Sequence, residues 1–594
     1  MKKKQIIKNN LFMLKILFQE APVFTIFKLS ERARSQTLVF FEHVYMIGFI
    51  IDAIVKQKPF WHVLLIIGII LAATTINPIF DIMGSYKFEP GVKQRVERRL
   101  KMALYEKASK IDLKCYDDPV FYNDFVWAMS QAPQQCWTVM MTFNGFIGNI
   151  VGLIIVGGYM ISQDMAGLAI VLVAFAGVFF FSAKKNKLNF KLQEKLKPYE
   201  RKRDYISRVF YLADYAKEIR ANRIKKKLVR DFNESIENLD KELKGGTRIL
   251  AALDFIVQFV FNTFLVEGIY LMYLLYQTIV RKVYSYGVMV TLYNSCGQLK
   301  GNFLELARTI PQFQENTLYI NKIKYFLEYP ITVTSPETAL PIPGGGDITL
   351  KNVSFSYEKK PILQNICLSI PKGAKVAFVG YNGAGKTTLV KLIMRLYDPD
   401  SGTLLYGGHD VKEYSLSDYR NQFAAVFQDF QIFAAPIRVN ITMDSQEFDK
   451  TKADVVTIKS GLAEIMAEHN YEYDTQLTKE FDDNGVIFSG GQAQSLAITR
   501  SLYKDSNIMI MDEPSSALDP KMEYNLNKTM FEVGKDKTVI TISHRLSTTK
   551  TADKIYMFEK GCIIEEGSHD ELMQKNGKYA EMFLRQAQNY NISS

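Results

Sequence analysis

Cysteine and histidine are scarce in this sequence, which has 5 cysteines and 6 histidines in 594 residues. No two cysteines form a CxxC pair or show the spacing of metal ligands, so we expect a reducing compartment and no disulfide framework. The sequence begins MKKK but lacks a short apolar segment that ends in a small-residue cleavage site. We therefore expect no cleaved signal peptide. The cysteines are Cys115, Cys136, Cys296, Cys367 and Cys562.

Acidic residues are too few to balance the basic ones, because 62 Asp and Glu stand against 73 Lys and Arg and leave a net charge of +11. A basic balance fits nucleic acid, anionic lipid headgroups or phosphate-rich ligands. Here the basic residues gather beside apolar runs, as in residues 184–203, which is typical of the cytoplasmic flanks of membrane helices. We therefore expect a lipid bilayer, and not nucleic acid, as a partner.

The composition indicates two parts of different character. Hydrophobic residues make up 48% of the chain, yet the mean hydropathy is only −0.04, which fits an apolar membrane half averaged with a polar half. The predicted fold class is a membrane all-α six-helix transmembrane domain followed by an α/β P-loop nucleotide-binding domain. The predicted boundaries are 1–328 for the transmembrane domain, 329–346 for a linker rich in proline, glycine and threonine, and 347–594 for the nucleotide-binding domain.

The first 328 residues alternate between apolar and polar stretches. An amphipathic segment at 10–30, which contains Pro22, is expected to lie as a helix on the cytoplasmic membrane surface. Two polar stretches, 81–136 and 184–248, are expected to form helices in water. Six apolar stretches are long enough to cross a membrane: 38–55, 60–79, 139–160, 166–182, 250–277 and 286–307.

Beyond the linker, strand-like runs alternate with helical ones, as in a largely parallel α/β sheet. The run at 375–380 (KVAFVG) leads into GYNGAGKT at 380–387, which matches G-x-x-x-x-G-K-[ST] between a strand and a helix. Such a loop wraps phosphate oxygens with backbone N–H groups, Lys386 supplies a positive charge, and Thr387 offers a hydroxyl to Mg²⁺. The predicted ATP-binding residues here are Gly380, Asn382, Gly383, Gly385, Lys386, Thr387 and Thr388.

A second motif supplies two adjacent carboxylates. The apolar run 508–511 ends at Asp512, which is expected to hold Mg²⁺, and Glu513 is expected to orient or deprotonate the attacking water. The alternative is a pair of acidic residues that only ends a strand. A phosphate loop upstream favours the catalytic interpretation.

The sequence FSGGQ at 488–492 resembles the signature of ATP-binding cassette (ABC) proteins, and the family's other motifs follow in order. The resemblance implies that Ser489, Gly490, Gly491 and Gln492 contact the γ-phosphate held by an opposite subunit, at a helix N-terminus. It also implies that Tyr357 stacks on adenine, that Gln428 couples the Mg²⁺ site to the membrane domain, that 516–519 (SALD) forms a dimer contact, and that His544 contacts the γ-phosphate. The catalytic set is thus Glu513, His544 and Gln428, and the metal set is Thr387, Gln428 and Asp512.

The membrane half resembles exporter-type members of the same family. Residues 116–125 resemble their first coupling region, and 216–232 resemble their second long intracellular loop. Residues 426–433 (VFQDFQIF) are most similar to half-transporters that export lantibiotic-type peptides. Ala493 and Ser495, where arginines are common, and Asp482, where glycine is common, depart from the family pattern and leave subfamily and partner open.

The resemblance implies an ATP-hydrolysing half-transporter in a bacterial plasma membrane, with its nucleotide-binding domain in the cytoplasm. It is expected to pair with a second copy or a related chain and to export an amphipathic peptide or drug by alternating access. The alternatives are a lipid or multidrug exporter, and an exporter-shaped importer that works as a heterodimer. A non-transporting ATPase would lack the apolar stretches, and a scaffold with an inactive cassette would lack the intact motifs.

Charged and polar residues in the apolar stretches indicate what the cargo is. Because such residues are costly in lipid, they are expected to face a central cavity that accepts a cationic amphipathic peptide or drug. An alternative places Glu42 and Asp52 in water near the ends of their spans. The expected cavity residues are Glu42, Asp52, Asp254, Glu267, Asn144, Asn149, Gln258 and Asn294, with Tyr270, Tyr273 and Tyr293.

Overall fold

The computed structural model describes residues 3–357, 360–444, 446–512, 537–542 and 549–591. They form two compact units, one from residues 1–109 and 123–329 and the other from residues 110–122 and 330–594. The short segment 110–122 was expected within the transmembrane domain. In the structure it belongs with the second unit instead, so the chain enters that unit twice.

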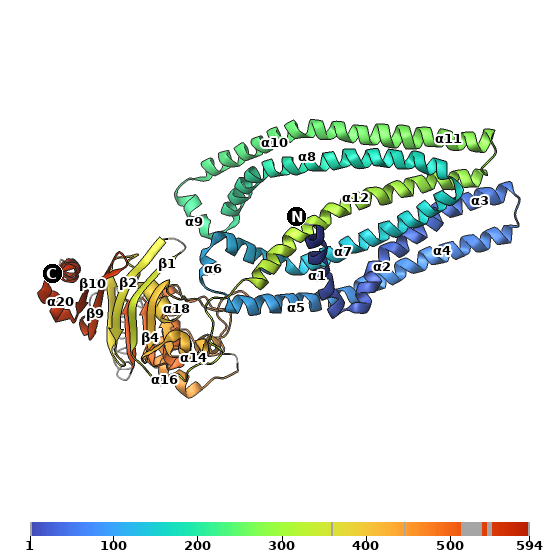
Figure 1. The fold of residues 1–594 in the computed structure, drawn as a ribbon. Coiled ribbons are helices and arrows are strands. Elements are labelled where there is room, and N and C mark those ends of the chain that lie inside the picture. Colours follow the sequence, from blue (N-terminus) through green and yellow to red (C-terminus); the bar gives the residue numbers. More distant parts are fainter. Residues whose placement is uncertain (1–2, 358–359, 445, 513–536, 543–548, 592–594) are drawn as a thin grey trace. The chain divides into compact units, whose positions relative to one another are not determined.

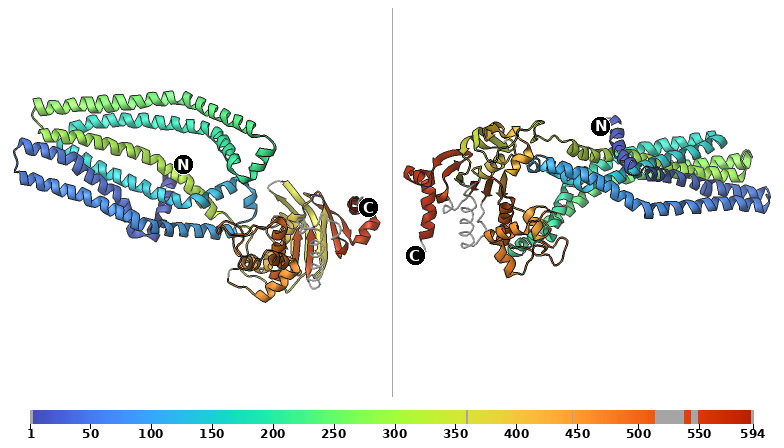
Figure 2. Two further views of the ribbon diagram at one scale, coloured as in Figure 1. Left: turned by 180° about the vertical axis from the view of Figure 1, so that it is seen from behind. Right: turned by 90° about the horizontal axis from the view of Figure 1, so that it is seen from below.

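The first unit consists of long helices that run alongside one another (Figures 1 and 2). Helices follow directly on from one another wherever the junction residue keeps a right-handed helical conformation, as Phe40 and Met46 do. The elements are α1 (Lys3–Glu20), α2 (Pro22–Val39), η1 (Phe40–Tyr45), α3 (Met46–Val55), α4 (Phe60–Met83), η2 (Gly84–Phe88), α5 (Glu89–Lys110), α7 (Pro119–Gln163), α8 (Met165–Tyr211), α9 (Ala213–Ala221), α10 (Lys225–Phe255), η3 (Ile256–Tyr270), α11 (Leu271–Leu275), η4 (Tyr276–Val280) and α12 (Tyr286–Glu328).

Five helical segments of the described chain are long and apolar enough to cross a membrane: 22–55, 60–110, 124–163, 165–211 and 225–280. Each contains one of the predicted spans. The sixth predicted span, 286–307, lies in α12, which is 43 residues long but is not among these apolar segments. The count of six apolar spans is therefore not confirmed, and the polar residues Asn294, Gln298 and Lys300 are the physical reason.

The N-terminal segment forms two helices and not one interfacial helix. Ala21 leaves the helical region with φ −154° and ψ 71°, and Pro22 then opens α2 at a position where its missing N–H costs nothing. Helix α2 continues through η1 into α3. The first span is therefore the end of a helical segment that starts at Pro22.

Helices α3 and α12 are joined at one end by a backbone contact and a capping carboxylate. Asp52 accepts hydrogen bonds from the Ser285 hydroxyl (2.7 Å) and the Gly287 N–H (2.8 Å), at the N-terminus of α12. A Cβ placed on Gly48 would lie 2.5 Å from the Gly287 carbonyl oxygen, and one on Gly287 would lie 2.2 Å from the Gly48 carbonyl oxygen. Only glycine at both positions permits this approach.

Several residues expected to face a cargo cavity have partners within the first unit. Asp52 caps α12, Asp254 forms an ion pair with Lys185 at 2.6 Å, and the Asn144 side-chain oxygen accepts the Arg32 N–H at 3.0 Å. Tyr270 is fully buried in the apolar core of this unit, and the Tyr273 hydroxyl donates to Asp164 at 3.0 Å. These contacts give each of the five residues a structural partner or a packed environment within this unit, whereas Glu267 is exposed.

The second unit contains two sheets, as the alternating pattern beyond the linker predicts. A four-stranded antiparallel sheet has the order β2-β1-β4-β5, and a six-stranded, mostly parallel sheet has the order β10-β9-β3-β8-β7-β6. The strands are β1 (Ile348–Tyr357), β2 (Lys360–Ile370), β3 (Lys375–Gly380), β4 (Ser401–Tyr406), β5 (His409–Asp410), β6 (Phe423–Val426), β7 (Ile508–Asp512), β8 (Thr538–Ile542), β9 (Lys554–Glu559) and β10 (Cys562–Gly567).

The helices of this unit are mostly short. They are α6 (Lys114–Asp117), α13 (Lys386–Ile393), η5 (Val411–Glu413), α14 (Leu416–Asn421), α15 (Ile437–Thr442), α16 (Lys450–Ser460), α17 (Leu462–Glu468), α18 (Gly490–Lys504), η7 (Thr549–Thr551), α20 (His569–Lys575) and α21 (Lys578–Asn591).

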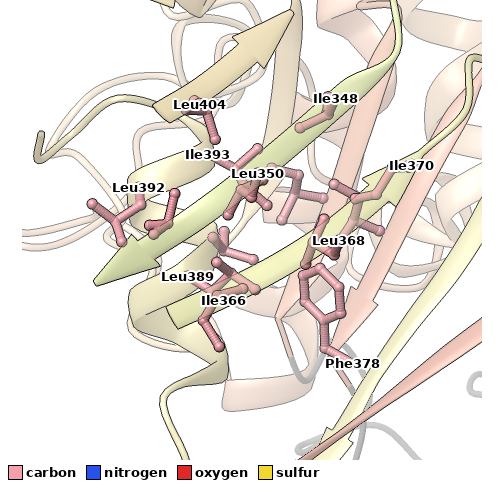
Figure 3. Packing of buried hydrophobic residues seen from close by; sticks show 14 of the residues in the cluster. Ile348, Leu350, Ile366, Leu368, Ile370, Phe378, Leu389, Leu392, Ile393 and Leu404 are labelled. Carbon is pink, nitrogen blue, oxygen red and sulfur yellow. The ribbon is translucent and has the colours of Figure 1, made fainter. Parts of the chain in front are cut away.

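One apolar core joins the two sheets and holds α13. Figure 3 shows Leu389, Leu392 and Ile393 of α13 packed beside Leu350 of β1 and Phe378 of β3, and all five side chains are almost fully buried. This packing fixes the start of α13 at the end of β3. The loop between them is thereby held in one place.

Asp112 ties the 110–122 segment to the residues that follow Pro330. Its buried carboxylate accepts hydrogen bonds from the Thr332 N–H (2.9 Å), the Thr332 hydroxyl (2.5 Å) and the Val333 N–H (3.0 Å). Burial by itself raises the pKa of Asp112, but these hydrogen bonds and the nearby Lys114 outweigh it and hold the pKa below its ordinary value.

We expect Asp112→Asn to loosen this connection. Losing hydrogen bonds to a charged group costs about 1.5–3 kcal/mol, so amide exchange at Thr332 and Val333 should accelerate about 10- to 100-fold in the full chain. Because the folded-state pKa is lowered, the carboxylate's contribution is complete above the unfolded pKa and is lost as the pH falls through the folded value. Hydrogen exchange with mass spectrometry measures this.

The control is Glu337→Gln, which makes the same carboxylate-to-amide change at an exposed position five residues after Thr332. Exposed charges contribute little to stability, so this variant should exchange nearly as the parent does. Equal acceleration in both variants would contradict a special role for Asp112.

Candidate nucleotide site

The loop between β3 and α13 has the backbone conformation of a phosphate cradle. Gly380 has φ 150° and Gly385 has φ 100°, a region that side chains rarely adopt. A Cβ on Gly380 would lie 2.3 Å from the Phe558 carbonyl oxygen, and one on Gly385 would lie 2.6 Å from the Leu363 side chain. Gly385 precedes the first turn of α13, and the free backbone N–H groups of such a turn suit the binding of an anion.

Lys386 is held inside this loop. Its ammonium group donates to the Gly380 carbonyl (2.8 Å) and the Tyr381 carbonyl (3.1 Å), and the residue is only 6% exposed. Its charge is thus fixed against the loop backbone. Asn382 and Gly383 lie exposed at the tip of the loop, whereas Thr388 is buried on α13.

Thr387 and Asp512 meet although they are 125 positions apart. The Thr387 hydroxyl donates to the Asp512 carboxylate at 2.8 Å, and Asp512 is only 2% exposed at the end of β7. A hydroxyl and a carboxylate beside a phosphate loop are the protein ligands that Mg²⁺ uses when phosphate oxygens and water complete its octahedral shell. The residues present therefore fit Mg²⁺.

Four neighbouring parallel strands, in the order β3-β8-β7-β6, have their carboxyl ends at the same edge of the sheet. Gln428 follows β6 by two residues and is exposed. Glu513 directly follows Asp512, and His544 follows the last residue of β8 by two positions. Glu513, His544 and the 516–519 segment lie outside the described residues.

Tyr357, the predicted adenine contact, belongs to an aromatic cluster. Its ring lies 5.5 Å from that of Tyr397 and 5.0 Å from that of Phe355. The Tyr397 hydroxyl donates to Asp117 of α6 at 2.9 Å. Burial, and then the hydrogen bond to Asp117, raise the pKa of Tyr397 well above its usual range, so the hydroxyl remains a donor at neutral pH.

The signature residues begin a different helix, α18. The Ser489 N–H donates to the Gln492 side-chain oxygen at 2.9 Å, and Ser489 in turn accepts the Gln492 N–H, which completes a capping box. The Gln492 amide nitrogen also lies 3.3 Å from His469 Nε2. Ser489 and Gly490 are exposed at this N-terminus, where their polar groups are available to a ligand.

The structure thus places the phosphate loop, Asp512 and Gln428 at one sheet edge, and the signature at the start of α18. Sequence reasoning missed Tyr397, Asp112 and His469. Asp112 and Tyr397 form hydrogen bonds with residues 220 or more positions away, and His469 lies 23 positions from its partner Gln492. None of the three belongs to a motif with a recognised spacing.

Comparison with known proteins agrees with this geometry. Residues 363–516 match the family model described as ABC transporter, which implies ATP binding at the phosphate loop. A solved bacterial Atm1-family ABC exporter with ATP bound superposes with a TM-score of 0.77 over 96% of this chain and 98% of its own, at 22% identity. The chain therefore has the ABC exporter fold, with a helical transmembrane domain and an ABC transporter domain.

Curated relatives are similar over part of the chain. The ATP-dependent lipid A-core flippase of Vibrio parahaemolyticus is 40% identical over 239 residues, and that of Escherichia coli K12 is 40% identical over 243 residues. The first match covers 40% of this chain and 40% of the relative, and the second covers 41% of each. The chain therefore spans about two-fifths of the length of these relatives.

With its five apolar helical segments, the chain is an integral membrane protein.

Proposed function

We propose that this chain is one half of an ATP-driven exporter that moves a lipid-like amphiphile by alternating access in a bacterial inner membrane. The Thr387–Asp512 pair beside the buried Lys386 carries the proposal, because this arrangement fits ATP with Mg²⁺ and occurs on an exporter fold. The similar relatives are lipid A-core flippases, which favours a lipid over the peptide that residues 426–433 indicated.

In this proposal Lys386 and the loop N–H groups bind the β- and γ-phosphates, and Tyr357 stacks on adenine. Thr387, Asp512 and Gln428 hold Mg²⁺, which would neutralise charge on the phosphate oxygens. Glu513 accepts the proton of the attacking water, and His544 contacts the γ-phosphate. Together these roles describe ATP hydrolysis at the edge of the six-stranded sheet.

We further propose that the working unit contains two such chains, or this chain and a related half-transporter. The exposed N-terminus of α18, with Ser489 to Gln492, would complete the ATP site of the other subunit. Because this chain carries both the phosphate loop and the signature, two copies would form two equivalent sites.

The transport test uses proteoliposomes that contain the purified chain and a fluorescent phospholipid. ATP added outside should move the labelled lipid from the outer to the inner leaflet of vesicles whose nucleotide-binding domains face outward, and protect it from a membrane-impermeant quencher. Lys386→Ala should abolish this protection. ATP-dependent uptake of a cationic peptide without lipid movement would support peptide export instead, and lipid movement in the opposite direction would support import.

A further inference from the structure

An apolar groove runs between α2 and the helices α4, η2 and α5, at the inner end of the second predicted span. It contains a pocket of about 670 Å³ and an adjoining one of about 590 Å³, which share Phe27 and Phe80. Phe27 packs directly onto Gly84, where an added Cβ would lie 2.8 Å from the ring. Figure 1 shows α2 beside α4. We call this feature the α2/α4 groove.

The basic residues around the α2/α4 groove fall into two groups. Lys87 and Arg95 line the larger pocket, are exposed, and have no carboxylate within ion-pair distance among the residues that the structure describes. Four other basic residues around the groove are paired with the protein's own carboxylates: Lys28 with Glu31 (2.8 Å), Arg34 with Asp81 (2.5 Å), Lys93 with Glu89 (2.9 Å) and Arg99 with Glu20 (2.6 Å). Lys87 and Arg95 therefore give the pocket a positive charge that these carboxylates do not offset.

The α2/α4 groove is apolar at the end next to the predicted span and basic at the end beyond it. Residues 60–110 form one helical segment, in which Phe80 lies next to the predicted span and Lys87 lies about 10 Å further along, at 1.5 Å per residue. Arg95 lies two turns beyond Lys87. Because Cα–Cβ bonds tilt toward the helix N-terminus, both basic side chains lean back toward the span. An apolar floor next to the bilayer core and a basic end outside it match an amphiphile with a negative headgroup.

We propose that the α2/α4 groove binds an anionic membrane phospholipid of the cytoplasmic leaflet. Its acyl chains lie against Phe27 and Phe80, and its headgroup phosphate contacts Lys87 and Arg95. A zwitterionic lipid would leave the two basic residues without a net counter-charge. This binding does not depend on ATP or on the transported substrate.

Trp137 provides a local probe, because its ring stacks on Phe24 of the groove at 6.2 Å between centroids. The chain has 3 tryptophans, so replacing Trp61 and Trp127 by Phe leaves Trp137 as the single emitter. This parent is reconstituted in phosphatidylcholine bilayers that contain brominated phosphatidylglycerol or brominated phosphatidylcholine. Quenching of Trp137 then reports which lipid occupies the groove.

We expect brominated phosphatidylglycerol to quench at a lower mole fraction than brominated phosphatidylcholine. One basic residue at a membrane surface contributes a factor of about five, so Lys87→Gln and Arg95→Gln should each reduce the preference about fivefold. Lys87→Arg should keep it, which separates loss of charge from misfolding. The matched control is Arg98→Gln, since Arg98 is an exposed arginine on α5 that does not line the pocket.

Three results would overturn the proposal. Equal quenching by both lipids would show no preference for a negative headgroup. Equal effects of Arg98→Gln and Arg95→Gln would show general surface charge and not a site. Quenching by neither lipid would show that another occupant, such as a second copy of the chain, covers the groove.

Discussion

Lys386→Ala is expected to weaken ATP binding about 10- to 100-fold, because the ammonium group supplies charged hydrogen bonds to phosphate, worth about 1.5–3 kcal/mol. In the structure the same group holds the loop through Gly380 and Tyr381, so alanine also loosens the cradle. Equilibrium binding of a fluorescent ATP analogue to the full-length chain measures the loss.

Lys391→Ala is the matched control. Lys391 lies in the last turn of the same helix, α13, and removing it changes the net charge equally without touching the phosphate loop. Its affinity should stay near that of the parent. An affinity of Lys386→Ala within twofold of the parent would contradict the proposed role of Lys386.

Glu513→Gln is expected to retain ATP binding while steady-state hydrolysis falls about 100-fold or more, since general-base catalysis contributes about 10²- to 10⁴-fold. The amide keeps the size of the side chain but cannot accept the proton. With turnover blocked, the dimer should accumulate in a closed state with ATP trapped between its two nucleotide-binding domains. Phosphate release measures hydrolysis, and the radiolabelled ATP that stays with the protein through gel filtration measures trapping.

Glu464→Gln, an exposed substitution on α17, serves as the control and should hydrolyse ATP as the parent does. Retention of normal turnover by Glu513→Gln would remove this residue from the catalytic role. If the parent alone neither hydrolyses ATP nor dimerises, but does both after a related half-transporter is added, the heterodimer is the working unit.

The parts of the site that could be predicted are those whose residues lie in short continuous motifs. The phosphate loop lies between β3 and α13, and Asp512 ends β7, so strand-like runs and glycine spacing were enough to find both. The link from Tyr357 through Tyr397 to Asp117 could not be predicted in this way, because Tyr397 and Asp117 are 280 positions apart. Such a contact depends on packing between segments that no local pattern relates.

The cargo residues show why polar positions in apolar stretches are harder to interpret. A carboxylate in such a stretch needs a partner, and the sequence does not say which one. Asp52 caps the N-terminus of α12, and Asp254 forms an ion pair with Lys185. A partner within the unit is therefore a second way, besides a central cavity, to offset the cost of placing a carboxylate in an apolar stretch.

The contact between Gly48 and Gly287 limits how the membrane unit can change shape. Where two helices touch through side chains, rotamer changes allow them to slide past each other. Here backbone meets backbone, and Asp52 holds the first turn of α12, so a shift by one helical turn would break the cap and force larger residues into the crossing. At this crossing α3 and α12 form a fixed pivot, and any opening of the membrane unit has to use the freedom of other helices.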